Sequence, residues 1–345
     1  MAGLFNQNIA WRCPSNIAIV KYWGKEGNQI PCNPSVSMTL SEAVTDVKLQ
    51  TFEKKQSGIE LEYFFEGEKN DSFQKRILKY LETNISHFPI LNDVAIRLSS
   101  HNSFPHSTGI ASSASAFGAI ALSLLDAEGI LNHVSDKDLF YTKASELARL
   151  GSGSACRSMF GGYTSWGEHP DIQNSSDLYA TKITDVHENF RKMMDAILIV
   201  DDEPKKVSSS VGHSLMNNHP YAENRFLQAK ENTGKIIKTL YNGDFGEFIK
   251  IAESEALALH AMMMTSMNYY LLMKPGTIHA IEKIIDFREM TKVPICFTLD
   301  AGPNVHVIYP EAFKNEVSDF LNNELKPDLK GIIFDKSGRG PEKLN

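Results

Sequence analysis

The sequence predicts an α+β protein in which strands and helices are mixed rather than strictly alternating. Three observations support this prediction. Short apolar runs at residues 16–20 and 295–299 are typical of buried strands. Longer segments with apolar residues at helical spacing dominate the second half of the chain. Residues 104–125 lead from a turn rich in Pro, Gly and Ser directly into an apolar helix.

The elements follow from periodicity and turn residues. In the first half we expect an edge strand at 11–14, strands at 16–20, 44–52, 59–65, 94–98 and 162–166, and helices at 73–83, 113–128 and 136–149. In the second half we expect strands at 196–200, 296–299, 305–308 and 331–334, and helices at 222–241, 245–265, 278–291 and 310–322. The polar stretch 169–188 separates these halves. We therefore expect an N-terminal domain over residues 1–185 and a C-terminal domain over residues 186–345.

The composition is that of a cytoplasmic enzyme. The 345 residues suffice for one large domain or two medium ones, and the net charge of −7 comes without a basic patch, so we expect no nucleic-acid partner. No basic segment followed by an apolar core begins the chain, and no apolar run reaches membrane length. We therefore expect neither a signal peptide nor a membrane partner. The four cysteines lack metal-ligand spacing, which predicts reduced thiols in the cytoplasm.

The turn before the apolar helix carries a chemical signal. Gly109 can take a positive φ, and hydroxyl side chains surround it at Ser107, Thr108, Ser112 and Ser113. A helix that begins on such residues presents unpaired N–H groups, and a phosphate fits that position. Because the lysine of a Walker-type loop is missing, an ordinary capped core helix stays open as the alternative.

A second segment, PSNIAIVKYWGK at residues 14–25, places Lys21 and Lys25 beside two aromatic residues at the end of a buried strand. Like charges this close repel each other unless an anion or an acid lies nearby. The alternative is a solvated strand end with a buried tryptophan.

A third segment, LARLGSGSACRS at residues 147–158, combines a Gly/Ser loop with Arg157. Backbone amides, hydroxyls and one guanidinium suit an oxyanion cradle. A flexible linker is the alternative, and the apolar flanks of the segment argue against it.

A fourth segment supplies an acid. In PICFTLDAGPNVHV at residues 294–307, Asp300 stands at the end of a buried strand and before a tight link to the next one. From this position alone, Asp300 is either a catalytic carboxylate or an aspartate that merely begins a turn.

Together the segments NIAIVKYWGK, FPHSTGIASSASAF, ARLGSGSACRS and TLDAGPNVHV resemble the diphosphomevalonate decarboxylases of the GHMP kinase superfamily, in the order of that family and at about its spacing. The resemblance spans roughly residues 14–308. It implies a two-lobed GHMP kinase-type fold, with a ribosomal protein S5 domain 2-like N-terminal lobe, a ferredoxin-like C-terminal lobe and the active site in the cleft between them. It also implies a homodimer.

The implied reaction is the ATP-dependent decarboxylation of (R)-5-diphosphomevalonate to isopentenyl diphosphate. ATP phosphorylates the tertiary 3-hydroxyl, and the 3-phosphate then leaves as CO₂ is lost. Asp300 matches the carboxylate that orients the hydroxyl and accepts its proton, Arg157 grips an anionic group, and Lys21 favours the charged form of Asp300. Mg²⁺ is expected because phosphoryl transfer depends on positioning and charge neutralisation, although the sequence identifies no metal ligands.

The same resemblance assigns the site residues. The catalytic set is Asp300, Arg157, Lys21, Ser112 and Ser113. The ATP phosphates are expected at Ser107, Thr108, Gly109, Ala111, Ser112 and Ser113. The substrate is expected at Asn16, Tyr22, Trp23, Gly24, Lys25, Ser152, Gly153, Ser154, Ala155, Cys156, Arg157, Ser209, Ser210 and, without a supporting motif, Arg76.

Two departures from the family pattern fall in the loop KKVSSSVGH at residues 205–213. His213 stands where Met is expected, and no Arg follows the serines, so substrate contacts in this loop stay open. The alternative functions are decarboxylation of the 5-monophosphate, 3-phosphorylation without decarboxylation, and a non-catalytic nucleotide-binding sensor. Retention of Asp300, Lys21 and Arg157 argues against the last two. His260 and its neighbouring methionines are expected to pack in the core.

Overall fold

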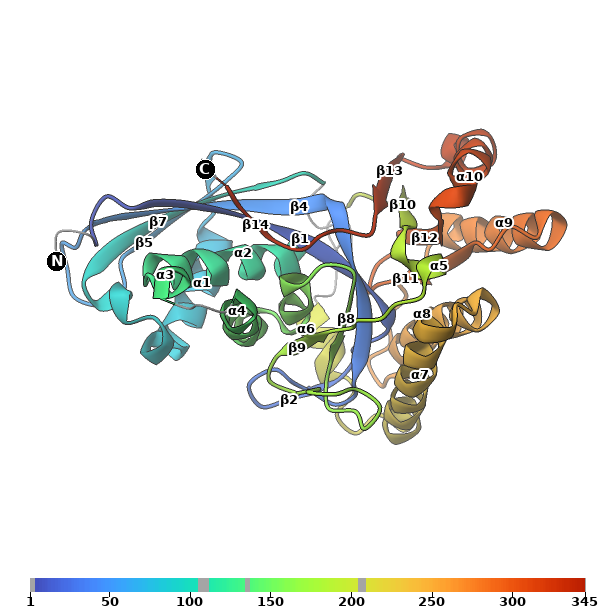
Figure 1. Ribbon diagram of the computed structural model, residues 1–345, viewed down its shortest axis with the longest axis horizontal. Coiled ribbons are helices and arrows are strands. Elements are labelled where there is room, and N and C mark those ends of the chain that lie inside the picture. The colour runs from blue at the N-terminus through green and yellow to red at the C-terminus, as the bar shows by residue number, and fades with distance from the viewer. Residues whose placement is uncertain (1–3, 105–111, 134–136, 204–208, 345) are drawn as a thin grey trace.

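The computed structural model describes residues 4–104, 112–133, 137–203 and 209–344 of the chain. The architecture is α+β, as the sequence predicts, and it has two lobes, each built on its own β-sheet (Figure 1). Each helix and strand expected from the sequence overlaps an element of the structure. No helix among the described residues is both long and apolar enough to cross a membrane.

The elements have the following bounds in chain order. The strands are β1 (Asn8–Val20), β2 (Lys25–Glu26), β3 (Ile30–Pro31), β4 (Ser35–Glu53), β5 (Leu61–Phe65), β6 (Glu68–Lys69), β7 (Val94–Asn102), β8 (Tyr163–Trp166), β9 (Ala180–Lys182), β10 (Met193–Ile199), β11 (Cys296–Leu299), β12 (Val305–Pro310), β13 (Gly331–Lys336) and β14 (Glu342–Leu344). The helices are α1 (Asp71–Thr83), α2 (Ser112–Ala127), α3 (Ile130–His133), α4 (Lys137–Gly151), α5 (Glu188–Arg191), α6 (Ser209–Ser214), α7 (Ala222–Asn242), α8 (Phe245–Thr265), α9 (Pro275–Thr291) and α10 (Lys314–Phe320). A short 3₁₀ helix, η3 (Gly153–Met159), follows α4.

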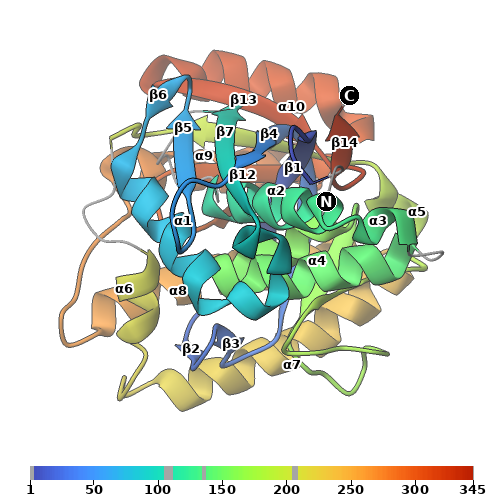
Figure 2. The same cartoon turned by 90° about the vertical axis from the view of Figure 1, so that its left-hand side faces the viewer.

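The larger sheet belongs to the N-terminal lobe and has the order β14-β1-β4-β7-β5-β6, with β8 paired to β4 and β9 paired to β8. Helices α1, α2 and α4 pack against one face of it (Figure 2). Helix α2 is apolar on nearly all sides, and it is almost entirely buried between the sheet and α4. The first turn of α2 is therefore held in a fixed place in this lobe.

Strand β1 is one continuous strand rather than an edge strand followed by a buried one. It pairs with β4 along its length, and its residues 10–12 also pair with β14. The register with β4 shifts between Pro14 and Asn16, where the proline has no N–H to donate. The prediction of an edge strand at residues 11–14 is wrong, because β14 pairs with this part of β1. β14 comes from the far end of the chain, and no local sequence pattern predicts that pairing.

The smaller sheet belongs to the C-terminal lobe, is antiparallel and has the order β11-β12-β10-β13. Strand β10 is buried on both faces. Met194, Ala196 and Leu198 join a core with α9 and α10. Ile197 and Ile199 point the other way and join α7, α8 and parts of β1 and β4 in a second core. This second core packs the two lobes together.

The last residues of the chain tie the two sheets to each other. After β13 the chain passes Leu40, whose backbone bridges Ser337, and β14 then joins β1 in the larger sheet (Figure 1). The buried carboxylate of Asp335, on β13, accepts the backbone N–H groups of residues 41, 42 and 43. The C-terminal segment thus contributes to both lobes.

Candidate active site

The end of β1 and the end of β11 meet at the junction of the two lobes. Lys21 follows β1 and Asp300 follows β11, and Lys21 Nζ donates a hydrogen bond to Asp300 Oδ1 at 3.0 Å. The Lys21 side chain is 1% exposed, whereas that of Asp300 is 24% exposed. Burial lowers the pKa of Lys21, the charges of Asp300 and Glu255 oppose that shift, and the charge of Arg157 adds to it. The structure thus brings Lys21, Asp300 and Arg157 together and leaves the carboxylate partly accessible.

Arg157 lies on η3 and is buried. Its Nη1 donates to Ser35 Oγ at 2.7 Å, its Nε donates to Asn16 Oδ1 at 3.3 Å, and its guanidinium lies 5.8 Å from the ring centre of Trp166. Burial lowers the pKa of Arg157, although an arginine stays charged in proteins. Asn16 Nδ2 also donates to Ser158 Oγ at 2.8 Å. In this structure Asn16, which the sequence assigns to substrate contact, orients Arg157.

The Gly/Ser segment forms a tight turn between α4 and η3, so the flexible-linker alternative is wrong. A side chain at Gly153 would approach Tyr22 Oη and the Trp166 ring to 2.9 Å each, so only a glycine lets the backbone come this close. Cys156 is fully buried, and its Sγ donates to Gly153 O at 3.0 Å. Burial raises the pKa of Cys156 to about 12. The side chains of Cys156 and Ala155 therefore pack inside the protein.

His213, on α6, lies between the rings of Tyr22 and Trp23, with ring centres 4.3 Å and 4.5 Å away. Its Nδ1 accepts a hydrogen bond from the Gly24 N–H at 3.0 Å, so the neutral ring carries its proton on Nε2. Burial, together with two nearby positive charges, lowers the pKa of His213 to about 3. The histidine that departs from the family pattern is thus an uncharged ring that holds α6 against the KYWGK segment.

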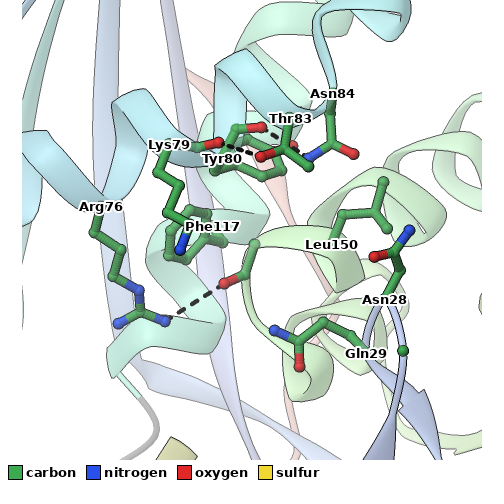
Figure 3. A pocket seen from close by; sticks show the side chains of 11 residues that line it. Asn28, Gln29, Arg76, Lys79, Tyr80, Thr83, Asn84, Phe117 and Leu150 are labelled. Carbon is green, nitrogen blue, oxygen red and sulfur yellow. Dashed lines mark hydrogen bonds between the residues drawn. The ribbon is translucent and has the colours of Figure 1, made fainter.

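Arg76 and Lys25 lie near each other although no sequence motif links them. Arg76 Nη2 donates to Gly151 O at 3.4 Å beside a pocket of about 390 Å³ between α1, residues 27–29 and the end of α4 (Figure 3). Lys25 Nζ donates to Gln29 Oε1 at 2.9 Å, and Gln29 lines that pocket. Burial and the charge of Arg76 lower the pKa of Lys25. In the described part of the chain neither cation is paired with a carboxylate, so an anion would be attracted here.

The start of α2 lies beside the Gly/Ser segment. Ser113 Oγ is 3.1 Å from Ser152 Oγ. Ser115, two residues further on, is buried with its Oγ 2.7 Å from Thr45 Oγ1 and has a structural role. The other residues expected to bind phosphate, Ser107, Thr108, Gly109 and Ala111, lie outside the described residues. Ser209 and Ser210 begin α6, but their side chains also lie outside the description.

A buried carboxylate that sequence reasoning missed lies directly behind Lys21. Glu255 Oε2 accepts the backbone N–H of Lys21 at 2.9 Å, and Glu255 forms a buried ion pair with Arg225. Asn232 Nδ2 donates to Glu255 Oε1 at 2.7 Å. One signal could have found it: Glu255 falls at helical spacing on the apolar face of α8, among Phe248, Ala252 and Leu259. A carboxylate at such a position is almost always paired.

Two histidines also have partners that the sequence did not indicate. His306 Nδ1 lies 2.7 Å from Asp195 Oδ2, and both side chains are buried in the smaller sheet. Burial alone would lower the pKa of His306, but the adjacent Asp195 outweighs it and raises the pKa. His260 is buried, as expected, and its Nε2 also lies 3.1 Å from the carbonyl oxygen of Asp300. Both histidines therefore lie close to the β11 end of the site.

Known proteins share the fold of this chain and are similar to it in sequence. A crystal structure of the mevalonate diphosphate decarboxylase from Staphylococcus aureus is 28% identical, covers 98% of both chains and gives a TM-score of 0.85. A structure described as MDDEF in complex with MVAPP, AMPPCP and magnesium is 25% identical, covers 98% of this chain and 99% of its own, and gives a TM-score of 0.84. These likenesses confirm the two-lobed GHMP kinase-type fold.

Sequence comparisons cover nearly the whole chain. The diphosphomevalonate decarboxylase of Ganoderma lucidum is 30% identical over 329 residues, which are 89% of this chain and 80% of the relative. The diphosphomevalonate decarboxylase of Saccharomyces cerevisiae is 27% identical, over 96% of this chain and 94% of the relative. Two family models match, the diphosphomevalonate decarboxylase-like N-terminal domain over residues 13–179 and the mevalonate 5-diphosphate decarboxylase C-terminal domain over residues 174–343. The chain therefore belongs to the diphosphomevalonate decarboxylase family.

Proposed function

We propose that this chain catalyses the ATP-dependent decarboxylation of (R)-5-diphosphomevalonate to isopentenyl diphosphate, CO₂, ADP and phosphate, in the mevalonate pathway of isoprenoid biosynthesis. The observation that carries the proposal is the Lys21–Asp300 ion pair at the junction of the lobes. It lies in a chain whose two halves both match models of this family. The relatives named above are diphosphomevalonate decarboxylases, and one structural neighbour contains MVAPP, AMPPCP and magnesium.

Asp300 is the proposed base. It orients the 3-hydroxyl and accepts its proton while the hydroxyl oxygen bonds to the γ-phosphorus of ATP and the bond from that phosphorus to ADP breaks. An ammonium at hydrogen-bond distance favours the ionised carboxylate that this role requires. The backbone of Asp300 is held in place, because its carbonyl oxygen accepts the N–H of Gly302 at 2.7 Å.

Arg157 is the proposed anion-holding residue of the second step, whereas Lys21 acts through Asp300. In that step the C3–O bond breaks and its electron pair leaves with phosphate, while the bond to the carboxylate breaks and its pair forms the new double bond. Arg157 holds the substrate carboxylate or a neighbouring phosphate through its planar fork. Burial strengthens this attraction, since charges interact more strongly away from water.

The 5-diphosphate is proposed to lie against the KYWGK segment and the Gly/Ser turn. Lys25 and Arg76 supply two positive charges there. Tyr22 Oη is buried and makes no hydrogen bond among the described residues. This supports a role in which the hydroxyl donates a hydrogen bond to a phosphate oxygen of the bound substrate. Two cations favour the 5-diphosphate over the 5-monophosphate, because the second phosphate adds negative charge.

The ATP phosphates are proposed to lie at the start of α2, near Ser112 and Ser113. The N-terminus of a long helix offers unpaired N–H groups, and Ser113 lies within reach of the Gly/Ser turn. Among the described residues no cluster of three His, Cys, Asp or Glu side chains could hold a metal ion. At phosphoryl-transfer sites Mg²⁺ is usually held by one or two carboxylates together with the substrate phosphates. When bound, Mg²⁺ neutralises charge on the phosphates.

A coupled assay of ADP release tests this proposal directly. Purified protein is given ATP, Mg²⁺ and, separately, mevalonate, its 5-phosphate or its 5-diphosphate, with CO₂ measured in parallel. We expect equal amounts of ADP and CO₂ with the 5-diphosphate. ADP release without CO₂ would indicate an enzyme that only phosphorylates the 3-hydroxyl. A preference for the 5-monophosphate would change the proposed substrate but not the proposed type of reaction.

We also propose that the chain works in the cytoplasm as a homodimer. The cytoplasmic assignment is supported by the four cysteines, all of which are free thiols in the structure. The homodimer is supported by the family resemblance of the sequence. Sedimentation velocity of the purified protein tests the dimer.

A further inference from the structure

Glu255 is a fully buried carboxylate at the junction of the lobes, and both of its oxygens accept hydrogen bonds. Its Oε1 accepts from Arg225 Nη1 at 3.1 Å and from Asn232 Nδ2 at 2.7 Å. Its Oε2 accepts from Arg225 Nη2 and from the backbone N–H of Lys21, the latter at 2.9 Å. The buried charge of Glu255 is therefore compensated within the C-terminal lobe, and one of its bonds reaches across to β1.

The bond to Lys21 falls where the β-ladder stops. Pairing between β1 and β4 ends at Val20, so the N–H of Lys21 needs an acceptor outside the sheet. Glu255, 234 positions away in the chain, provides it. The carbonyl oxygen of Lys21 is held as well, because Asn33 Nδ2 donates to it at 2.9 Å. The backbone of Lys21 is thus fixed on both sides of its side chain.

The side chain of Lys21 is directed toward Asp300 from this fixed backbone. Its Nζ donates to Ala18 O at 2.5 Å and to Asp300 Oδ1 at 3.0 Å. We propose that Glu255 is a positioning residue of the active site, which fixes the backbone of Lys21 and helps keep its buried ammonium charged beside Asp300. The inference rests on the proposed function, because it takes Lys21 to act in the reaction.

The charge of Lys21 is set by groups from several elements. Asp300 and Glu255 favour the ammonium, whereas burial and the charge of Arg157 disfavour it. His306, on β12, lies close enough for its charge and that of Lys21 to affect each other. Removing the negative charge of Glu255 leaves the positive charge of Arg225 uncompensated. The charged form of Lys21 is then less favoured, so the pKa of Lys21 falls further.

The test is Glu255→Gln, whose amide oxygen can still accept the N–H of Lys21 but carries no charge. We expect kcat with the 5-diphosphate to fall by about 10- to 100-fold, with a smaller change in KM. Activity requires the ammonium and is lost as pH rises through its pKa. The alkaline limb of kcat/KM should therefore move to lower pH by roughly half a unit or more. Glu255→Asp, which keeps the charge, should restore the position of that limb.

The matched control is Glu253→Gln. Glu253 also lies on α8 and is paired with an arginine, Arg288, but it makes no contact with Lys21. We expect this variant to lower the melting temperature while kcat and the pH profile stay unchanged. If Glu255→Gln leaves the protein unfolded, Glu255→Gln combined with Arg225→Met removes the carboxylate without burying an unpaired charge, and the alkaline limb should then move in the same direction by a smaller amount.

A readout without turnover separates this inference from the proposed function. The chemical shift of a lysine Cε carbon changes when the amine loses its proton, so the Lys21 signal of ¹³C-lysine-labelled protein, followed by NMR as a function of pH, reports its charge. We expect the Lys21 signal to titrate at lower pH in Glu255→Gln than in the wild type or in Glu253→Gln. A wild type inactive on the 5-diphosphate would contradict the proposed function alone. A folded Glu255→Gln with unchanged kcat, pH profile and Lys21 titration would overturn the role of Glu255.

Discussion

Lys21 Nζ lies 3.0 Å from Asp300 Oδ1, although 279 positions of the chain separate the two residues. Lys21 directly follows a strand of the larger sheet, and Asp300 directly follows a strand of the smaller one. The ion pair therefore forms only when the two lobes pack together. It also pairs a buried ammonium with a partly exposed carboxylate, so Asp300 is the more accessible member of the pair.

The first prediction concerns the carboxylate. Asp300→Asn should lower kcat by about 10²–10⁴-fold, because an amide cannot accept the proton of the 3-hydroxyl. The amide is of the same size, so substrate binding by calorimetry and the circular dichroism spectrum should stay close to wild type. A variant that keeps more than a third of the activity would remove Asp300 from the role of base.

The second prediction concerns the guanidinium fork. Arg157→Lys keeps the charge but cannot bond Ser35 and Asn16 as Arg157 does. We expect kcat/KM to fall roughly tenfold or more, as for the loss of one charge-assisted bond of about 1.5–3 kcal/mol. The control is Arg12→Lys, because the ion pair of Arg12 with Asp46 is more exposed and joins β1 to β4; this variant should leave activity unchanged. Lower stability with unchanged turnover would make Arg157 merely structural.

The third prediction separates the two possible phosphate substrates. Lys25→Ala should raise KM for the 5-diphosphate more than it lowers kcat, because a phosphate contact acts mainly on binding. The 5-monophosphate should be affected much less. Steady-state kinetics on both substrates measure this, with Lys143→Ala, in an ion pair on α4, as the control cation. Equal losses on both substrates would place Lys25 away from the terminal phosphate.

The fourth prediction follows from the uncharged ring of His213. Its pKa is lowered from 6.5 to about 3, so between those values the unfolded chain binds a proton that the folded protein does not. Stability should therefore decrease as pH falls from about 6.5 towards 3, by up to about 1.4 kcal/mol per pH unit from this residue. His213→Met should flatten that decrease in urea unfolding between pH 7 and pH 5. The control is His279→Gln, at a half-exposed histidine paired with Asp328. If the slope for His213→Met matches the slopes for the wild type and this control, His213 is not buried in the neutral form.

The fifth prediction concerns the pair in the smaller sheet. The pKa of His306 is raised, so its contribution to stability is present at low pH and is lost as pH rises through the folded value. Asp195→Asn leaves the imidazolium buried without a counterion and should destabilise the protein by about 3–5 kcal/mol at pH 6. The loss should be smaller at pH 9, because the protonated share of His306 falls as pH rises. Equal losses in urea unfolding at both pH values would show that His306 is not charged.

The functional motifs could be predicted because each lies within one short stretch of chain. The KYWGK segment, the Gly/Ser turn and the Asp300 turn each combine a strand or helix end with small or charged residues, and local sequence encodes such ends. Arg76 had no such motif. It comes near Lys25 only because α1 packs against the end of α4, and that packing depends on residues spread over the N-terminal lobe.

The sequence by itself determined the order of the longer strands and helices, the family resemblance, and which residue types stand at the ends of β1, α4 and β11. Periodicity and turn residues are local properties, so they can be read without a structure. Only the tertiary structure decided that β14 joins β1, that His306 pairs with Asp195, and that Glu255 holds Lys21. Each of these contacts joins residues more than 100 positions apart. These contacts stabilise the protein only when elements distant in the chain pack together. Polar and charged groups leave water in the same step, and a local sequence pattern does not indicate which distant groups will meet.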